Sequence, residues 1–340
     1  MRLFVVACVL LGSLPGAAAI GWSPADRVGR GMKLAIPDLI SNSYFPALAA
    51  AELGFFEREG LEVSAELIFP VDRAYEALRD GAVDFVGGAA HGALAAFTEW
   101  RGVKLLGALA QGVYWFLVMR AELGIARGDL AALKGRRIGA APWVEMGLRG
   151  LLSAAGLDPH RNDIRIGPVP GATGSSVSFG LTAAKALENG EIDGFWANGM
   201  ATELAVTTGV GTIVLDVRRG DGPAGCFDYT MPVLATTDRL IERSPDTAAA
   251  ALRALVATQN ALKADVSRAT EVGDKRFPPR EAALIAGIIR RDLPFYGAAI
   301  SESSVTAINE FARSMSVLDD DVPYADIVAT RFRHLWHSGA

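Results

Sequence analysis

The stretch Lys33–Val63, KLAIPDLISNSYFPALAAAELGFFEREGLEV, decides how the rest of the chain is interpreted. It opens with a short apolar run, Leu34–Ile36, which Pro37 ends. A polar turn follows, then a helix predicted over about Phe45–Glu59 and a second strand over Leu61–Leu67. In open α/β sheets, ligands bind outside the carboxyl ends of the strands. The turn after the first strand is therefore a candidate ligand site.

The same order of elements returns over Gly135–Val169, GRRIGAAPWVEMGLRGLLSAAGLDPHRNDIRIGPV. After each copy, a helix leads into a turn and a strand, at Ala74–Val86 and at Ala183–Trp196. Both segments contain the pattern A-L-x-x-G-x-[VI]-D, in which Asp84 matches Asp193. We interpret the two aspartates as structural groups of the turn. The repeat predicts two related α/β units in one chain.

The N-terminus has the composition of a secretory signal peptide. Arg2 is a minimal positive region, Leu3–Leu14 is apolar, and Ala17–Ala19 is a small-residue cleavage site. We predict a signal peptide over residues 1–19 and a mature protein that begins near Ile20; an N-terminal core strand or helix is the alternative. Cys8 lies inside the apolar region, and we predict no lipid anchor there.

The composition indicates a soluble, exported globular protein. A length of 340 residues favours two domains of ~150 residues each, and the 51% hydrophobic content suffices for two cores. Beyond the N-terminus no apolar run approaches the ~18 residues that span a bilayer. The net charge of −5 makes nucleic acid and anionic membranes poor partners. Export would leave Cys226 alone, so no intramolecular disulfide is expected.

Two apolar segments are predicted to cross between the units. Gln111–Met119 leaves the first unit, and Phe227–Thr236 returns to it. The glycine-rich Pro170–Ser176 is interpreted as a connector with Ser175 or Ser176 as a helix cap; phosphate binding is the alternative. Asp238–Ala340 is expected to be mostly helical and to pack on the first unit. A helix is expected after His91, and further strands are predicted at Ala82–Val86, Val103–Leu109, Arg137–Ala140, Ile164–Val169, Ile192–Trp196 and Thr212–Asp216.

This layout resembles the periplasmic substrate-binding proteins of ABC importers, in particular the NMT1/THI5-like group of nitrate, sulfonate, taurine and pyrimidine-precursor binders. The resemblance covers nearly the whole mature chain. The segments that carry it are AAELGFFEREGLEV (Ala50–Val63), ALRDGAVDFVGG (Ala77–Gly88), LKGRRIGAAP (Leu133–Pro142), ALENGEIDGFWA (Ala186–Ala197) and DVPYADIV (Asp321–Val328).

The resemblance implies a type II periplasmic binding protein fold of two α/β lobes joined by two crossing segments. Lobe 1 would comprise residues 20–113 and 232–340, and lobe 2 residues 114–231. It further implies a periplasmic monomer without a cofactor and without enzymatic activity. Such a protein closes on one small solute and delivers it to an ABC permease in the inner membrane, which works with its ATPase.

Closure of two lobes predicts ligand contacts from the strand-end turns and the crossings. The first turn offers hydroxyl, amide and phenol groups, and the crossings and second lobe add aromatic rings and two carboxylates. The predicted ligand-binding residues are Ser41, Asn42, Tyr44, Ala90, His91, Gln111, Tyr114, Trp115, Trp143, Glu145, Trp196, Asn198, Asp228 and Tyr229.

The turn at Trp143-Val144-Glu145 bears on the ligand. Sulfonate and taurine binders carry small polar residues there, and a buried carboxylate beside a sulfonate costs several kcal/mol unless it is protonated or paired. We therefore do not expect a sulfonate or nitrate ligand. Our hypothesis is a ligand with an amine or N–H donors and a flat apolar part, held by Trp143 and Glu145. The fungal pyrimidine synthases of this fold carry a cysteine-rich motif that this chain lacks.

Several of these residues have plainer interpretations. Trp115 and Trp196 could instead be core residues, and His91 could be a helix cap or a surface histidine. Ser41 and Asn42 have the commoner role of helix caps, and Glu145 that of complementing a helix dipole. His334 and His337 are three residues apart without other ligands, so we predict no metal site.

Two functions of other classes remain as alternatives to the transport protein. One is an enzyme that uses the same cleft, with Glu145 and His91 as acid and base. The other is a protein that presents its ligand to a membrane sensor. Turnover assays separate the enzyme from the binding protein, and neighbouring permease and ATPase genes separate the importer from the sensor partner.

Overall fold

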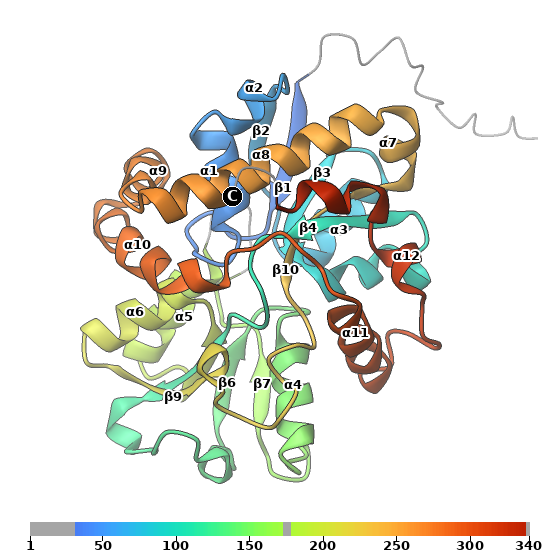
Figure 1. Cartoon of the computed structure of the whole chain (residues 1–340). Helices are drawn as coiled ribbons and strands as arrows, with labels where there is room; N and C mark the ends of the chain where they lie inside the picture. The colour runs from blue at the N-terminus through green and yellow to red at the C-terminus, as the bar shows by residue number, and fades with distance from the viewer. Residues whose placement is uncertain (1–30, 173–177, 338–340) are drawn as a thin grey trace, which may run out of the picture. The chain divides into compact units, whose positions relative to one another are not determined.

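The computed structural model describes residues 31–172 and 178–337. The signal peptide predicted for residues 1–19 and the caps predicted at Ser175 or Ser176 lie outside the described residues. From Met32 on, the chain forms one unit that contains two five-stranded sheets, each flanked by helices (Figure 1). The prediction of an α/β fold with two related units is confirmed.

The first sheet has the strand order β2-β1-β3-β10-β4. Strands β2, β1 and β3 are parallel to one another, whereas β10 is antiparallel to both β3 and β4. The strands are β1 (Met32–Ile36), β2 (Val63–Leu67), β3 (Phe85–Ala89), β4 (Val103–Ala108) and β10 (Pro232–Thr237).

The second sheet repeats this plan with the order β7-β6-β8-β5-β9. Strands β7, β6 and β8 are parallel, and β5 is antiparallel to β8 and β9. The strands are β5 (Phe116–Arg120), β6 (Arg137–Ala140), β7 (Arg165–Gly167), β8 (Gly194–Ala197) and β9 (Gly211–Asp216).

The single antiparallel strand of each sheet follows from the two crossings. Strand β5 begins the second sheet directly after the chain leaves the first, and β10 begins directly after the chain returns. A strand that enters from the edge where the parallel strands end must run in the opposite direction. The parallel strands of both sheets therefore direct their carboxyl ends toward the crossings, as the predicted cleft requires.

Several predicted boundaries differ from the structure. The helix predicted over Phe45–Glu59 is divided into α1 (Phe45–Glu52) and α2 (Phe55–Arg58), because Gly54 adopts a left-handed conformation with φ 71°. The strand predicted at Ala82–Val86 begins three residues later, as β3. The helix expected after it is the 3₁₀ helix η2 (Ala90–Ala95).

The chain after β10 is helical, as predicted. Its longest helix, α8 (Pro245–Ala264), packs on α1, α2 and β4 of the first unit (Figure 1). By contrast, α10 (Pro279–Asp292) packs on α6 (Gly199–Thr207) of the second unit, so the C-terminal helices contact both units, whereas the sequence predicted packing on the first alone. The other helices are α3 (Val71–Arg79), α4 (Glu145–Ala154), α5 (Phe179–Glu188), α7 (Asp238–Arg243), α9 (Arg268–Arg276), α11 (Glu302–Ser314) and α12 (Tyr324–Ile327). The lobe boundaries 20–113 with 232–340, and 114–231, stay a prediction.

Candidate functional site

A cavity of about 40 Å³ lies between the two lobes, where the parallel strands end. Asp38 follows β1, Pro142 follows β6 and Asn198 follows β8. We call this the inter-lobe cavity. Its polar and aromatic lining consists of Asp38, Ser43, Tyr44, Phe69, Trp115, Phe179, Trp196 and Asn198.

Asp38 is the carboxylate of this lining, and it is only 7% exposed. Its Oδ1 accepts a hydrogen bond from the N–H of Ile40 at 3.0 Å. Its Oδ2 accepts one from Oγ of Ser178 at 2.8 Å and a longer one from Nδ2 of Asn198 at 3.5 Å. Burial raises the pKa of Asp38 to about 6, against the lowering effect of these bonds. The group therefore holds its charge at neutral pH at a cost in free energy.

Asn198 is oriented by the helix that it caps. Its Oδ1 accepts hydrogen bonds from the N–H groups of Met200 (3.0 Å) and Ala201 (3.2 Å), at the start of α6. Because the amide oxygen is engaged there, the amide nitrogen is left to face Asp38. The end of β8 thus presents a fixed donor to the carboxylate of the opposite lobe.

Aromatic rings form the apolar walls of the inter-lobe cavity. The rings of Trp115 and Trp196 lie 5.9 Å apart between centroids, and those of Phe69 and Phe179 stack at 6.4 Å with an interplanar angle of 18°. Phe69 comes from the first lobe and Phe179 from the second. Two buried polar atoms of the lining, Nε1 of Trp196 and Oγ of Ser43, have no hydrogen-bond partner among the described residues.

His91 connects the lobes beside this cavity. It is fully buried, its Nε2 lies 2.9 Å from the carbonyl oxygen of Trp143, and its Nδ1 lies 2.8 Å from Oγ1 of Thr230. A carbonyl only accepts, so Nε2 carries the proton and Nδ1 accepts from the threonine hydroxyl. Burial lowers the pKa of His91 to about 4, so the ring is neutral at physiological pH.

Trp143 holds an unusual backbone conformation at the same contact. Its φ of 67° lies in the left-handed region, which bulky residues rarely adopt. Its side chain packs against the apolar core of the first lobe, although the residue follows β6 of the second. Strained backbone of this kind persists only where surrounding contacts enforce it, and it concentrates at functional sites.

A buried polar network joins the lobes on another side. Asn42 donates from Nδ2 to Asp292 at 2.6 Å, and its Oδ1 accepts from the N–H of Met200 at 3.2 Å. Arg218 donates from Nη1 to the other oxygen of Asp292 at 2.9 Å, with the arginine side chain only 5% exposed. Asp292 therefore bridges an asparagine of the first lobe and an arginine of the second.

The inter-lobe cavity brings together Tyr44, Trp115, Trp196 and Asn198 of the predicted ligand-binding residues. Trp115 and Trp196 are also buried, at 3% and 0% exposure, so they belong to the core and to the cavity wall at once. Tyr114 lies directly behind Trp115, with the ring centroids 4.9 Å apart.

The other predicted residues make contacts within the protein. Neither Ser41 nor Asn42 caps α1, the helix that follows them, because Oγ of Ser41 accepts from the N–H of Ser43. Asn42 donates to Asp292 and accepts from the N–H of Met200 at the start of α6, in the other lobe. Gln111 donates to the carbonyl oxygens of Gly297 and Ala299. The N–H of Ala90 donates to the carbonyl oxygen of Met231, and the hydroxyl of Tyr229 donates to that of Gly147. Asp228 is exposed to solvent.

Glu145 lies at the start of the second lobe's first helix, outside the lining of the inter-lobe cavity, and its role in holding the ligand stays a hypothesis. It begins α4 and lies one helical turn from Arg149, with Nε and Oε1 3.8 Å apart. Partial burial raises its pKa, and the arginine opposes this. Neither Glu145 nor Trp143 belongs to the lining of the inter-lobe cavity.

The sequence analysis missed Asp38, Phe69 and Phe179. Asp38 had a detectable pattern, because it follows the proline that ends the first predicted strand. Phe69 follows β2 and Phe179 is the first residue of α5, and nothing in their immediate sequence distinguishes them from core residues.

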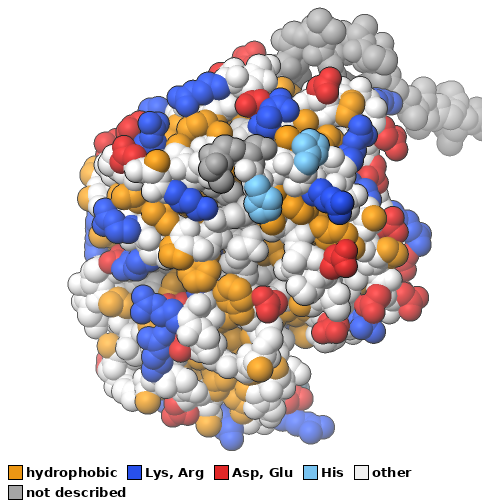
Figure 2. Space-filling model, in the orientation of Figure 1, with side chains coloured by type: hydrophobic (Ala, Val, Ile, Leu, Met, Phe, Trp, Pro, Cys, Tyr) orange, Lys and Arg blue, Asp and Glu red, His pale blue; other side chains and the backbone are white. Residues whose placement is uncertain are grey.

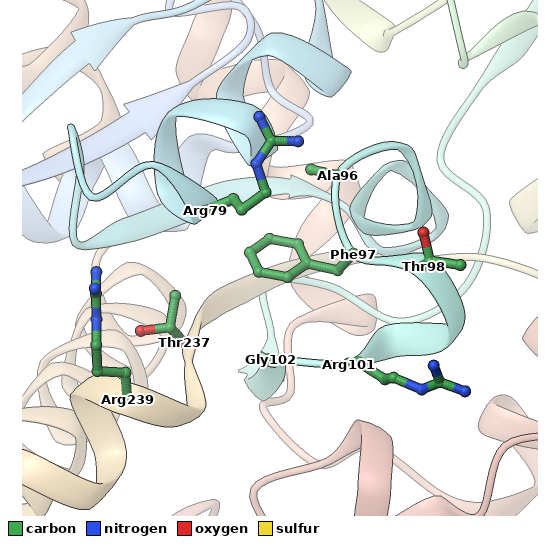
Figure 3. Close-up of a pocket in the computed structure, with 8 residues that line it drawn as sticks. All are labelled: Arg79, Ala96, Phe97, Thr98, Arg101, Gly102, Thr237 and Arg239. Carbon is green, nitrogen blue, oxygen red and sulfur yellow. The ribbon is translucent and has the colours of Figure 1, made fainter. Parts of the chain in front are cut away.

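A larger and more open cavity of about 420 Å³ lies at the opposite edge of the first sheet (Figure 3). Arg79, Arg101 and Arg239 surround it, with Phe97 between Arg79 and Arg101 in this view and Thr237 beside Arg239. Arg79 pairs with Asp80 and Arg101 pairs with Glu99, and all three arginines are exposed to solvent. Exposed, locally paired arginines need no ligand, so this cavity is the weaker candidate.

Surface and composition limit other kinds of site. Figure 2 shows acidic, basic and hydrophobic side chains on one face, without the continuous basic surface that nucleic acid requires. Within residues 31–172 and 178–337 there is no group of three His, Cys, Asp or Glu side chains able to hold a metal ion. In the same residues, no helix has the length and apolar character needed to cross a membrane.

Solved structures show the same fold. A protein from Bordetella bronchiseptica RB50 has a TM-score of 0.70 at 20% identity, covering 89% of this chain and 96% of its own. The alkanesulfonate-binding protein SsuA from Xanthomonas axonopodis pv. citri, bound to MOPS, has a TM-score of 0.65 at 14% identity, covering 88% and 97%. The desulfurization enzyme DSZB has a TM-score of 0.59 at 16% identity, covering 89% and 98%.

These TM-scores show a shared fold, that of the two-lobed periplasmic binding proteins. DSZB shows that an enzyme also has this fold. No curated protein matches the chain. A family model described as NMT1/THI5 like matches residues 41–265, which is well over half of the sequence. The chain therefore belongs to the NMT1/THI5-like family.

Proposed function

We propose that this protein is the extracytoplasmic solute-binding component of an ABC importer. It captures a small organic ligand, bearing an amine or a heteroaromatic ring, between its two lobes by hinge closure, and delivers it to a permease that works with an ATPase. The proposed location is the periplasm, reached by the signal peptide predicted at residues 1–19. The observation that carries the proposal is the inter-lobe cavity, with a carboxylate, aromatic walls and two unpaired buried polar atoms.

The contacts around the cavity fit a hinge-closing protein. His91 reaches the backbone of Trp143 in the opposite lobe, and Asp38 reaches Ser178. Both contacts are single hydrogen bonds that involve a side chain, and each contributes little net free energy, so they can form and break as the lobes move. A ligand in the cavity contacts both lobes and thereby favours the closed state by its differential affinity.

The arrangement favours binding over catalysis. Both ring nitrogens of His91 are engaged in hydrogen bonds, and Glu145 lies outside the cavity lining, so the acid–base pair of the enzyme alternative is not assembled. Cys226 is buried and burial raises its pKa to about 11, which leaves the thiol protonated and a poor nucleophile.

A ligand screen tests this function. The chain from residue 20 on would be screened by thermal shift against amines, heteroaromatics, aromatic acids, sulfonates, nitrate and amino acids. A ligand present at ~100 times its dissociation constant stabilises the folded state by about 2.7 kcal/mol. Small-angle scattering would then report lobe closure, and chromatography would show the ligand recovered unchanged. Consumption of the ligand would overturn the binding function in favour of an enzyme.

Delivery needs a separate measurement. The ligand-loaded protein is expected to stimulate ATP hydrolysis by its cognate permease–ATPase complex in proteoliposomes, and the ligand-free protein to do so less. Stimulation of a sensor kinase in place of an ATPase would point to the sensor partner.

A further inference from the structure

We propose that Asp38 is the anchor for the ligand and that the ligand is a small organic cation, with N–H donors on a flat apolar skeleton. This inference rests on the proposed function and specifies its ligand class. It replaces Glu145, which the sequence hypothesis favoured, by a different carboxylate in the opposite lobe.

The first argument is the missing counter-charge of Asp38. The groups that act on this carboxylate are the hydroxyl of Ser178, the amide of Asn198 and the backbone N–H groups of Ile40 and Gly180. All of them are neutral donors, and no ion pair of Asp38 occurs among the described residues. Buried charges in proteins are normally paired, because isolated burial costs several kcal/mol. A cationic ligand supplies the absent partner.

Asp292 provides an internal comparison. It is as fully buried as Asp38, but Arg218 lies 2.9 Å from it as a counter-charge within the protein. An arginine therefore pairs with Asp292, whereas Asp38, which lines the cavity, has no cationic partner among the described residues. This difference is expected where the second charge arrives with a ligand.

The walls of the cavity suit the same ligand class. Trp115, Trp196 and Tyr44 line the same cavity as Asp38, and aromatic faces attract cations. The same rings bury flat apolar area without ordering flexible side chains. An anion in the cavity would be repelled by the Asp38 carboxylate and by the negative faces of these rings.

One more polar atom defines a second feature of the ligand. The indole N–H of Trp196 is buried in the cavity wall, without an acceptor within residues 31–172 and 178–337. An acceptor atom on the ligand, such as a ring nitrogen or a hydroxyl oxygen, would satisfy it. The cavity of about 40 Å³ admits only the cationic group as the lobes stand here, so the ligand would enter with the lobes further apart and the lobes would then close on its flat skeleton.

Matched compounds test the charge directly. Each set carries an aminomethyl, a hydroxymethyl, a carboxylate or a sulfonate group on one skeleton: a short alkyl chain, benzene, pyridine or pyrimidine. Binding to the chain from residue 20 on would be measured by titration calorimetry and thermal shift. The aminomethyl members are expected to bind at least about tenfold more tightly than their hydroxymethyl partners, since an ion pair in a desolvated site exceeds a neutral hydrogen bond.

Two variants locate the charge. Asp38→Asn keeps the shape and removes the charge, although one acceptor oxygen becomes a donor and at least one of the bonds from Ile40, Ser178 and Asn198 is lost. It is expected to weaken the aminomethyl compounds by about tenfold or more, while the hydroxymethyl compounds change little. Glu145→Gln is the matched control, because it also replaces a carboxylate by an amide near the cleft but outside the cavity lining. It is expected to leave the affinities for aminomethyl and hydroxymethyl compounds unchanged.

The outcomes separate this inference from the proposed function. Tight binding of sulfonates or carboxylates, or equal binding of amines by wild type and Asp38→Asn, overturns the cationic ligand and leaves the solute-binding function standing. A loss at Glu145→Gln in place of Asp38→Asn would return the anchor to Glu145. Failure of every compound to bind would count against the proposed function and, with it, this inference.

Discussion

Asp84 and Asp193 make the same hydrogen bond in the two lobes. Oδ2 of Asp84 accepts from the N–H of Lys33 at 3.0 Å, and Oδ2 of Asp193 accepts from the N–H of Arg137 at 2.8 Å. The backbone N–H of each aspartate donates in return to the carbonyl of the same partner. The repeated aspartate therefore joins the approach to one parallel strand to the start of its neighbour, which supports its interpretation as a structural residue.

Asp193→Ala is expected to reduce the free energy of unfolding by about 2 kcal/mol, because the N–H of Arg137 would lose its buried acceptor. Chemical denaturation measures the change, and ligand affinity should stay the same. Glu188→Ala removes an exposed carboxylate paired with Lys185 and is the control, with little change in the midpoint. Equal effects of both variants would contradict the structural role.

Asp38→Asn is expected to make the ligand-free protein more stable at pH 7.5. Burial raises the pKa of Asp38 to about 6 from its usual 3.8, so the folded state favours the protonated group. This contribution is fully present below about pH 4 and is lost as the pH rises through 6. A shift of about two pH units corresponds to about 3 kcal/mol.

Thermal and chemical unfolding between pH 4 and pH 7.5 would check this relation. The stability difference between Asp38→Asn and wild type should grow across that interval and then level off. A difference independent of pH would mean that Asp38 is not a strained buried charge.

His91→Phe is expected to shift the ligand-free protein toward an open arrangement, because Nε2 no longer donates to the carbonyl of Trp143. Loss of one such bond costs about 1 kcal/mol, which is roughly a fivefold change in the equilibrium between the states. His91→Gln, whose amide nitrogen can reach the same carbonyl, is the control. Fluorescence transfer between labels on the two lobes would report the closed fraction.

The protonation of His91 gives a second test of this contact. Burial lowers its pKa to about 4, so the folded state favours the neutral ring. Its contribution to stability is full above about pH 6.5 and is lost as the pH falls toward 4. This is opposite in sign to the effect of Asp38, and the His91→Phe variant should therefore lose less stability than wild type on acidification.

Asp292→Ala is expected to destabilise the protein by about 3–5 kcal/mol, because Arg218 would remain buried without its partner. Adding Arg218→Met should recover much of that loss, since the second change removes the unpaired charge. The coupling free energy from the double-mutant cycle by urea denaturation measures the interaction. Additive losses would show that the two residues do not act as a pair.

Much of the fold could be predicted from the sequence, because its determinants are local. The repeated strand–turn–helix pattern, the aspartates at positions 84 and 193 and the glycines that end helices all lie within short segments. The predicted strand Arg137–Ala140 agrees with β6 residue for residue. Boundaries shifted where a turn changed the path, as at Gly54, whose left-handed conformation divides one predicted helix into two.

The candidate site could be predicted only in part. Of the predicted ligand-binding residues, Tyr44, Trp196 and Asn198 lie at or after strand ends and line the inter-lobe cavity, because the carboxyl edge of a parallel sheet is a general feature. Their contact with a ligand stays a prediction. The same rule also nominated Ser41, Gln111 and Glu145, which make internal contacts instead. Position in the sequence shows which end of a strand a residue follows, but not which way its side chain turns.

The sequence by itself determined two related α/β units, the family and the crossings between the lobes. Only the tertiary structure decided that Asp38 lines a cavity with neutral donors and no counter-charge from the part of the chain that the structure describes, because its partners Ser178 and Asn198 lie 140 and 160 residues away. Periodicity and turn chemistry act over a few residues. The charge balance of a buried group depends on every side chain that folding brings around it, and folding here brings neutral donors from the opposite lobe.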